Sequence, residues 1–114
     1  MTIRSSSPVP PCAPADLVAV AVGGFQVLLA WTEFGAGALE FRIMRADGSG
    51  SANRFSEIGR TGTHVIAFRD GSVRPRTTYY YRVHGWNGSG DSSPSNVVEV
   101  TTPQAEPKLP ADQE

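Results

Sequence analysis

Polar and apolar residues alternate most regularly in the stretch 73–87, which opens with a turn signal at Pro75. A period of two indicates a β-strand with one buried face, because successive side chains of a strand point to opposite faces. We therefore expect this stretch to form the central strand of a sheet. Its inward phase holds Tyr79, Tyr81, Val83 and Gly85, and its outward phase holds Tyr80, Arg82, His84 and Trp86.

Six further segments are typical of short strands, since each is apolar or alternating and is bounded by Gly, Asp, Asn or Ser turn residues. No segment shows a helical period. The pattern predicts an all-β protein, a seven-stranded antiparallel β-sandwich. The six segments are 16–20, 26–32, 39–45, 55–58, 65–68 and 97–102, with Gly59 ending the fourth, a flexible turn over 46–53 and a Gly/Ser loop over 88–95.

The inward phases of these segments supply enough apolar side chains for one core between two sheets. Trp31 and Tyr81 are expected to be its bulkiest members. Leu39 falls in the inward phase of its segment as well. The other expected core residues are Leu17, Val27, Leu29, Phe41, Ile43, Ile66, Phe68, Tyr79, Val83, Val98 and Val100.

The length of 114 residues predicts one domain, and the flanks differ from it in composition. Residues 1–13 are rich in Ser and Pro, which favours an extended linker or tail, and residues 103–114 form a Pro-containing acidic tail. The domain itself is expected over residues 14–102.

Charge and cysteine content exclude several classes of function. The net charge is −1, without a basic cluster, so nucleic acid is not an expected partner. No apolar run is long enough to span a membrane, and the first residues lack the apolar core of a signal peptide. Cys12 is the only cysteine, which excludes an intramolecular disulfide, and we expect it to be exposed.

No catalytic, cofactor or metal constellation occurs in the sequence. The carboxylates are scattered singly, and no Gly-rich loop leads into a helix. His64 and His84 fall on different predicted strands, without a cysteine or a paired carboxylate at ligand spacing. We therefore expect a protein that is not an enzyme and that holds no cofactor and no metal.

Several short motifs occur in a fixed order along residues 13–102, namely Pro14-Ala15-Asp16-Leu17, Val27-x-Leu29-x-Trp31, Phe41-x-Ile43-x-Arg45, Phe68-x-Asp70, Pro75-x-Thr77-x-Tyr79-x-Tyr81-x-Val83, Asn87, Gly90-x-Ser92, Pro94-Ser95-Asn96 and Thr101-Thr102. In this order and spacing, the chain resembles the fibronectin type III domain over most of its length. The stretches Ile43-Met44-Arg45 and Thr78-Tyr79-Tyr80-Tyr81-Arg82-Val83 are similar to bacterial members, which often occur beside catalytic and carbohydrate-binding modules in secreted enzymes.

This resemblance implies an immunoglobulin-like sandwich of seven strands and an extracellular or cell-surface location, although this chain carries no signal peptide. It also implies that Tyr79 is a tyrosine-corner residue, whose hydroxyl hydrogen-bonds backbone a few residues upstream. Partners would be neighbouring domains of the same polypeptide or another protein.

One outward face stands out as a candidate interaction face, because it is rich in the Tyr, Trp, Met and Arg side chains that are enriched at interfaces. The competing interpretation is that these side chains only stabilise an exposed sheet through cross-strand pairs. The face comprises Arg42, Met44, Tyr80, Arg82, His84, Trp86, Val97 and Glu99.

An odd number of strands leaves the two termini at opposite poles, which suits a spacer between neighbours. The sequence therefore predicts a non-catalytic spacer or protein-interaction module. One alternative is a carbohydrate-binding accessory module with Tyr80 and Trp86 as stacking platforms for a polysaccharide. The other is a small stand-alone subunit that docks on a larger assembly through the same face.

Overall fold

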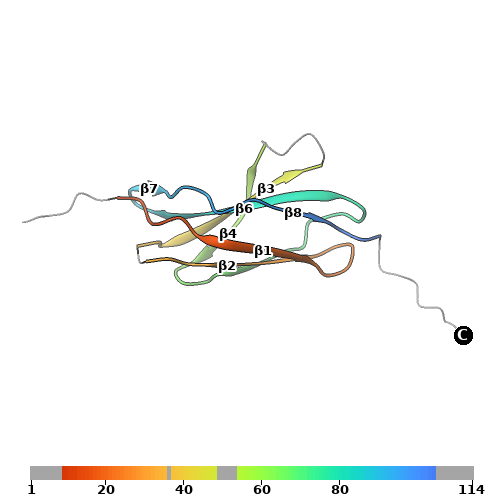
Figure 1. The fold of residues 1–114 in the computed structure, drawn as a ribbon, viewed down its shortest axis with the longest axis horizontal. Helices are drawn as coiled ribbons and strands as arrows, with labels where there is room; N and C mark the ends of the chain where they lie inside the picture. The colour runs from red at the N-terminus through yellow and green to blue at the C-terminus, as the bar shows by residue number, and fades with distance from the viewer. Residues whose placement is uncertain (1–8, 36, 49–53, 105–114) are drawn as a thin grey trace, which may run out of the picture.

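The computed structural model describes residues 9–35, 37–48 and 54–104. These residues form eight β-strands in two layers, and these ranges contain no helix, hence none that could cross a membrane (Figure 1). The strands are β1 (Ala15–Ala21), β2 (Val27–Thr32), β3 (Glu40–Asp47), β4 (Ser56–Gly62), β5 (Ala67–Asp70), β6 (Thr78–Asn87), β7 (Gly90–Asp91) and β8 (Val98–Thr101).

The two layers are antiparallel sheets, as expected for a β-sandwich. One sheet has the order β1-β2-β5, and the other has the order β4-β3-β6-β7, with β8 also paired to β6. Both β7 and β8 run antiparallel to β6, so they are two pieces of one interrupted strand. The interruption explains why eight strands are present where seven were predicted, and it places β7 inside the predicted Gly/Ser loop.

Two serines bridge the gap between β7 and β8. The Ser92 hydroxyl accepts a hydrogen bond from the backbone N–H of Gly85 at 2.8 Å, and the Ser95 hydroxyl accepts one from the N–H of Val83 at 3.0 Å. Pro94 lies between them and has no N–H to donate, which is a reason for the ladder to break here. The serine side chains therefore satisfy β6 backbone groups that a continuous strand would have paired.

The core lies between the sheets and confirms most of the expected inward residues. Trp31 packs edge-on against Phe41 with ring centroids 5.6 Å apart, and Tyr81 is fully buried. Leu17, Val27, Leu29, Ile43, Tyr79 and Val83 are also buried, and Phe68, Val98 and Val100 are partly buried against them. Ala38, Ala46 and Val73 are buried too, although the sequence pattern did not single them out.

Two expected core residues are instead exposed. Leu39 is 55% exposed and Ile66 is 40% exposed. Each directly precedes a strand, because β3 begins at Glu40 and β5 begins at Ala67. The alternation of inward and outward side chains holds only inside the pleated strand. Applied to the residue just before each strand, it wrongly predicted that Leu39 and Ile66 would be buried.

The fourth strand is longer than predicted and does not end at Gly59. It runs to Gly62, with Gly59 opposite Ile43 and a register shift between Ile43 and Met44. A side chain at position 59 would overlap the ring of Phe68, so this glycine marks a close approach between strands rather than a turn.

Both described ends of the chain are held against β6, at its opposite ends (Figure 1). At one end Asn87 Nδ2 donates to the Val9 carbonyl, and Pro11 is buried beside Gly85. At the other end the Thr77 N–H donates to the Thr102 hydroxyl, and the Arg76 N–H donates to the Pro103 carbonyl.

The domain limits of 14 and 102 stay a prediction, although contacts of the fold reach upstream to Val9. Cys12 is exposed, as expected. Most of the two predicted tails, and residues 49–53 of the predicted flexible turn, lie outside the described residues.

Candidate interaction face

Register places seven of the eight predicted face residues on the outer side of the larger sheet. Arg42 lies opposite His84, and Met44 lies opposite Arg82. Tyr80 lies between Ala46 on β3 and Glu99 on β8, and Trp86 pairs with Glu40 and Asp91. The eighth residue, Val97, is half exposed just before β8 begins.

Trp86 is covered on one side by a charged neighbour. The Arg42 guanidinium carbon lies 4.6 Å from the Trp86 ring centroid, a cation–π geometry. Arg42 also forms ion pairs of 3.5 Å with Glu40 and 3.8 Å with Asp91. A sugar ring could therefore stack on Trp86 only from its other side or by displacing Arg42.

The ion pairs continue onto the edge strand β4. Arg60 lies 3.6 Å from Glu40 and is also paired with Glu57. His84 is engaged as well, since its Nδ1 donates to the Ser92 carbonyl at 3.0 Å. This part of the face is therefore held together by ion pairs and a cation–π contact between strands, as the cross-strand interpretation requires. Arg42 Nε and one Glu40 oxygen nevertheless make no hydrogen bond within the described ranges.

Arg82 differs from the other arginines of the face. Its guanidinium carbon lies 4.3 Å from the centroid of the Phe55 ring, and its Nε, like that of Arg42, is buried without a hydrogen-bond partner among the described residues. Arg82 also makes no ion pair within the described ranges, and Glu99, which lies opposite Tyr80, makes none either.

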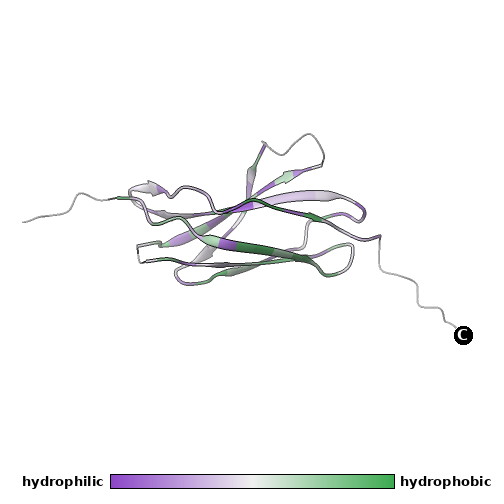
Figure 2. Ribbon diagram, in the orientation of Figure 1, coloured by the Kyte–Doolittle hydropathy of each residue, from purple (hydrophilic) through white to green (hydrophobic). Residues whose placement is uncertain are grey.

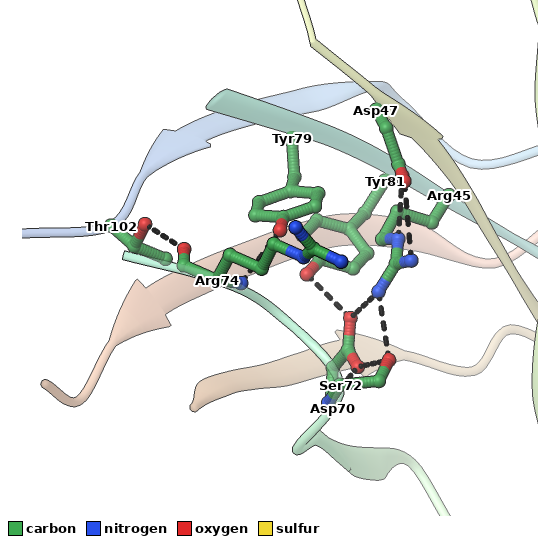
Figure 3. A network of polar contacts seen from close by, with 8 residues as sticks. All are labelled: Arg45, Asp47, Asp70, Ser72, Arg74, Tyr79, Tyr81 and Thr102. Atoms are coloured by element: carbon green, nitrogen blue, oxygen red, sulfur yellow. Dashed lines mark hydrogen bonds and ion pairs between the residues drawn. The ribbon is translucent and has the colours of Figure 1, made fainter. Parts of the chain in front are cut away.

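A buried polar cluster lies on the inner side of the same sheet, at one end of the core (Figure 3). The Asp70 carboxylate, 3% exposed, accepts hydrogen bonds from the Tyr81 hydroxyl at 2.7 Å and from Arg45 Nη1 at 2.9 Å. Its other oxygen accepts from the Ser72 N–H at 3.0 Å and the Ser72 hydroxyl at 2.7 Å. Arg45 also pairs with Asp47 and stacks 4.9 Å above the Tyr79 ring.

The cluster shifts the pKa values of its members. Burial by itself would raise the pKa of Asp70, but the hydrogen bonds from Ser72, Tyr81 and Arg45 outweigh it and hold that pKa below its usual range. Burial, together with the hydrogen bond to Asp70, raises the pKa of the Tyr81 hydroxyl. Both Asp70 oxygens are occupied and the groups keep their ordinary charge states at neutral pH, so the arrangement is structural rather than reactive.

Sequence reasoning missed this cluster, because it treated the carboxylates as scattered singly. One signal was present: Arg45 falls in the inward phase of β3, two residues after Ile43, and lies opposite Tyr81. A charged residue in an inward phase requires a buried partner. The sequence pattern did not identify that partner, because Asp70 comes from the other sheet.

The tyrosine corner implied by the resemblance is confirmed. The Arg74 backbone N–H donates to the Tyr79 hydroxyl at 2.7 Å, five residues upstream (Figure 3). The Thr102 hydroxyl donates to the Arg74 carbonyl, so the same backbone segment is held from two sides.

The outer face of the smaller sheet is unexpectedly apolar. Val18 pairs with Ala30, and Val20 pairs with Leu28; Figure 2 shows β1 as mainly hydrophobic. Val18 and Val20 are more than half exposed, and they line a shallow groove of about 570 Å³ with Leu28, Ala30, Ala67 and Arg69 among its walls. The apolar residues in both phases of β1 and β2 were the signal for this face.

Among the described residues, no group of three or more His, Cys, Asp or Glu side chains is placed to hold a metal ion. His64 lies 3.0 Å from Glu33, away from His84. The two histidines are therefore not brought together.

Comparison with known proteins finds similar structures but no similar sequences. No protein-family model matches the sequence, and no curated protein matches it significantly. The FN5 domain of Drosophila Lar superposes with a TM-score of 0.68 at 21% identity, covering 83% of this chain and 99% of that one. A fourth FNIII domain of human origin gives 0.70 at 19% identity, covering 96% and 94%.

Domains A168–A170 of titin give a TM-score of 0.70 at 22% identity over 82% of this chain. This chain spans about a third of that titin fragment, 32%. The sheet topology and the Tyr79 corner agree with these likenesses. The chain has the fold of a fibronectin type III domain, an immunoglobulin-like β-sandwich.

Proposed function

We propose that the chain is a non-catalytic module that holds its neighbours in a polypeptide or assembly at a fixed separation. The observation that carries the proposal is the position of the two described ends, which are hydrogen-bonded at or next to opposite ends of β6. Structural neighbours occur within multidomain chains, such as the titin fragment and the twitchin kinase region. The bacterial origin and the extracellular location expected from the resemblance remain predictions.

A spacer requires ends that are fixed relative to each other as well as far apart. β6 has 10 residues, which at ~3.3 Å per residue separates its ends by about 30 Å. Hydrogen bonds from side chains and backbone anchor Val9 at one end and Pro103 at the other. Tension or torque on one end would therefore pass to the other through a continuous strand.

The distance between the two ends can be measured by double electron–electron resonance between two spin labels. Spin labels on Val9→Cys and Gln104→Cys, in a Cys12→Ser background, are expected to give a narrow distance distribution centred at roughly 30–40 Å. Asn87→Ala serves as the control, because it removes the hydrogen bond to Val9 and is expected to broaden the distribution. A broad distribution in the parent protein would contradict a rigid spacer.

A second candidate function, docking of a protein through the outer face of the larger sheet, is favoured by the part of the face around Arg82. There Met44, Phe55 and Tyr80 lie next to Arg82, a cation that forms no ion pair with any carboxylate among the described residues. Carbohydrate stacking has less support, because Arg42 already covers one side of Trp86.

A further inference from the structure

Ion pairing separates the arginines of the larger sheet into two groups. Arg42, Arg45 and Arg60 each lie within 4.0 Å of a carboxylate of the chain itself. Arg82 lies on the same sheet and has no carboxylate within that distance among the described residues. The undescribed segment 49–53 of the neighbouring β3–β4 connection contains no acidic residue that could serve.

The surroundings of Arg82 are mostly apolar. Met44 lies opposite it on β3, and the Phe55 ring lies 4.3 Å from its guanidinium carbon. Tyr80 precedes it by two residues on the same face, and the pairing of Tyr81 with Val98 places Val97 alongside. We refer to Met44, Phe55, Tyr80 and Arg82 as the Arg82 cluster.

Neighbouring acidic groups either pair with other cations or, like Glu99 opposite Tyr80, lie more than 4.0 Å from the Arg82 guanidinium nitrogens. Glu40 and Glu57 pair with Arg60, and the Ser92 carbonyl accepts from His84. Arg82 Nε is buried with no hydrogen-bond partner among the described residues, as is Arg42 Nε. Arg42 has carboxylates within 4.0 Å, whereas Arg82 has none among the described residues. A buried donor without a partner is uncommon in folded proteins and carries a desolvation cost that an incoming acceptor would remove.

Stacking makes Arg82 a prepared ligand group. A guanidinium held over an aromatic ring can still offer its terminal Nη–H groups to an acceptor in the plane of the guanidinium. Because Phe55 already restricts the side chain, less rotamer freedom is lost when a partner binds. A carboxylate matches the paired N–H donors of the guanidinium edge and supplies the missing negative charge.

We propose that the Arg82 cluster binds the carboxylate of an Asp or Glu side chain on a protein partner, with an apolar neighbour of that residue packing on Met44 and Tyr80. This inference rests on the docking function proposed above and specifies its chemistry. A protein is favoured over an acidic polysaccharide, because Met44 and Phe55 offer apolar contact rather than the hydrogen-bonding groups that sugar hydroxyls need.

The test is a titration followed by nuclear magnetic resonance of the ¹⁵N-labelled protein, with the Arg82 Nε–H signal as the readout. The probe is the capped peptide acetyl-Leu-Glu-Leu-amide, and its control is acetyl-Leu-Gln-Leu-amide. The Glu peptide is expected to shift the Arg82 Nε–H signal, and the Gln peptide to bind about tenfold more weakly, since it lacks the negative charge and the second acceptor oxygen of the carboxylate.

Variants assign the effect to this arginine. Arg82→Gln is expected to weaken the Glu peptide about tenfold, whereas Arg69→Gln, an exposed arginine of β5 in the smaller sheet, is expected to leave binding unchanged. If Arg82→Gln does not fold, Arg82→Lys takes its place. This variant keeps the charge but lacks Nε and the planar edge, so it too is expected to bind the Glu peptide more weakly than the parent.

The outcomes that would contradict the carboxylate proposal differ from those that would also contradict docking on this face. If both peptides shift Met44 and Tyr80 equally while Arg82 Nε–H does not move, docking on this face survives and the carboxylate proposal is wrong. If no residue of the face responds to either peptide, both are wrong. If polygalacturonate shifts the Arg82 signal and the Glu peptide does not, the choice of a protein partner is overturned.

Discussion

Two tyrosines, two positions apart on β6, contribute to the fold by different means. Tyr79 uses its hydroxyl to accept a hydrogen bond from the Arg74 N–H, and Tyr81 uses its hydroxyl to donate to the Asp70 carboxylate. Both rings are buried, with centroids 6.4 Å apart. Each hydroxyl therefore needs a partner, and each partner lies outside β6.

Removal of the Tyr79 hydroxyl tests the first of these contacts. Tyr79→Phe keeps the ring and leaves the Arg74 N–H without its acceptor, so we expect about 1 kcal/mol less free energy of unfolding. Urea denaturation measures the loss. Tyr80→Phe, on the outer face, is the matched control, and an equal loss in both variants would contradict a special role for Tyr79.

The Asp70 cluster predicts a specific dependence of stability on pH. The pKa of Asp70 is lowered in the folded state from ~3.9 in the unfolded chain, so its contribution is complete above about pH 4. It is lost as the pH falls toward the folded pKa. Asp70→Asn is expected to cost about 3 kcal/mol at pH 7, and progressively less relative to the parent below pH ~4.

Urea denaturation of both proteins between pH 7 and pH ~2 measures this difference. Asp91→Asn, which alters an exposed carboxylate, is expected to keep the parent's pH dependence. A difference between the parent and Asp70→Asn that does not change with pH would show that the Asp70 charge is not responsible for the stabilisation.

At the scale of strands, β4 shows how a glycine can be misread. Gly59 was predicted to end the strand, yet it lies inside β4, where the ring of Phe68 approaches its backbone. A glycine that permits close packing and a glycine that permits a turn look alike in a sequence. Only the partner, here a residue of β5 in the other sheet, distinguishes them.

The close approach predicts a difference between two glycines of one strand. Gly59→Ala would push a methyl group into the Phe68 ring and is expected to cost about 1–3 kcal/mol. Gly62→Ala faces open space and is expected to change the free energy of unfolding by no more than ~0.5 kcal/mol. Thermal or urea denaturation of the two variants compares them, and equal stabilities would refute the packing role.

At the scale of the whole molecule, the two sheets present different outer surfaces. The larger sheet carries arginines, acids and aromatic residues that mostly pair with one another, and the smaller sheet carries exposed valines and leucine. The described ends, at Val9 and Pro103, are hydrogen-bonded to residues at or next to the two ends of β6. The larger sheet therefore both connects the ends and displays the Arg82 cluster.

A truncation tests how far the folded unit extends. Residues 14–104 lack the buried Pro11 and the Asn87–Val9 hydrogen bond that residues 9–104 retain. The shorter chain is expected to be about 1–2 kcal/mol less stable, from lost apolar burial and one hydrogen bond. Calorimetry on both fragments measures this. Identical stability would support the domain start at residue 14 that composition predicts.

The sequence by itself determined the strands and their inward faces, because alternation with a period of two is a local property. It correctly assigned Trp31, Phe41, Tyr81 and Val83 to the core. The order of short motifs identified the fold and the role of Tyr79. The alternation rule failed for Leu39 and Ile66, because each lies one residue before its strand, where the pleated backbone has not yet begun.

Only the tertiary structure decided which side chains satisfy one another. The Asp70–Arg45 pair joins residues of different sheets, and the Phe55 ring reaches Arg82 from beyond β4. Such contacts link positions tens of residues apart, so they cannot be predicted from a periodic pattern in the sequence. The predicted face could therefore be located from sequence, but the fold was required to show that Arg42 forms ion pairs and that Arg82 forms none among the described residues.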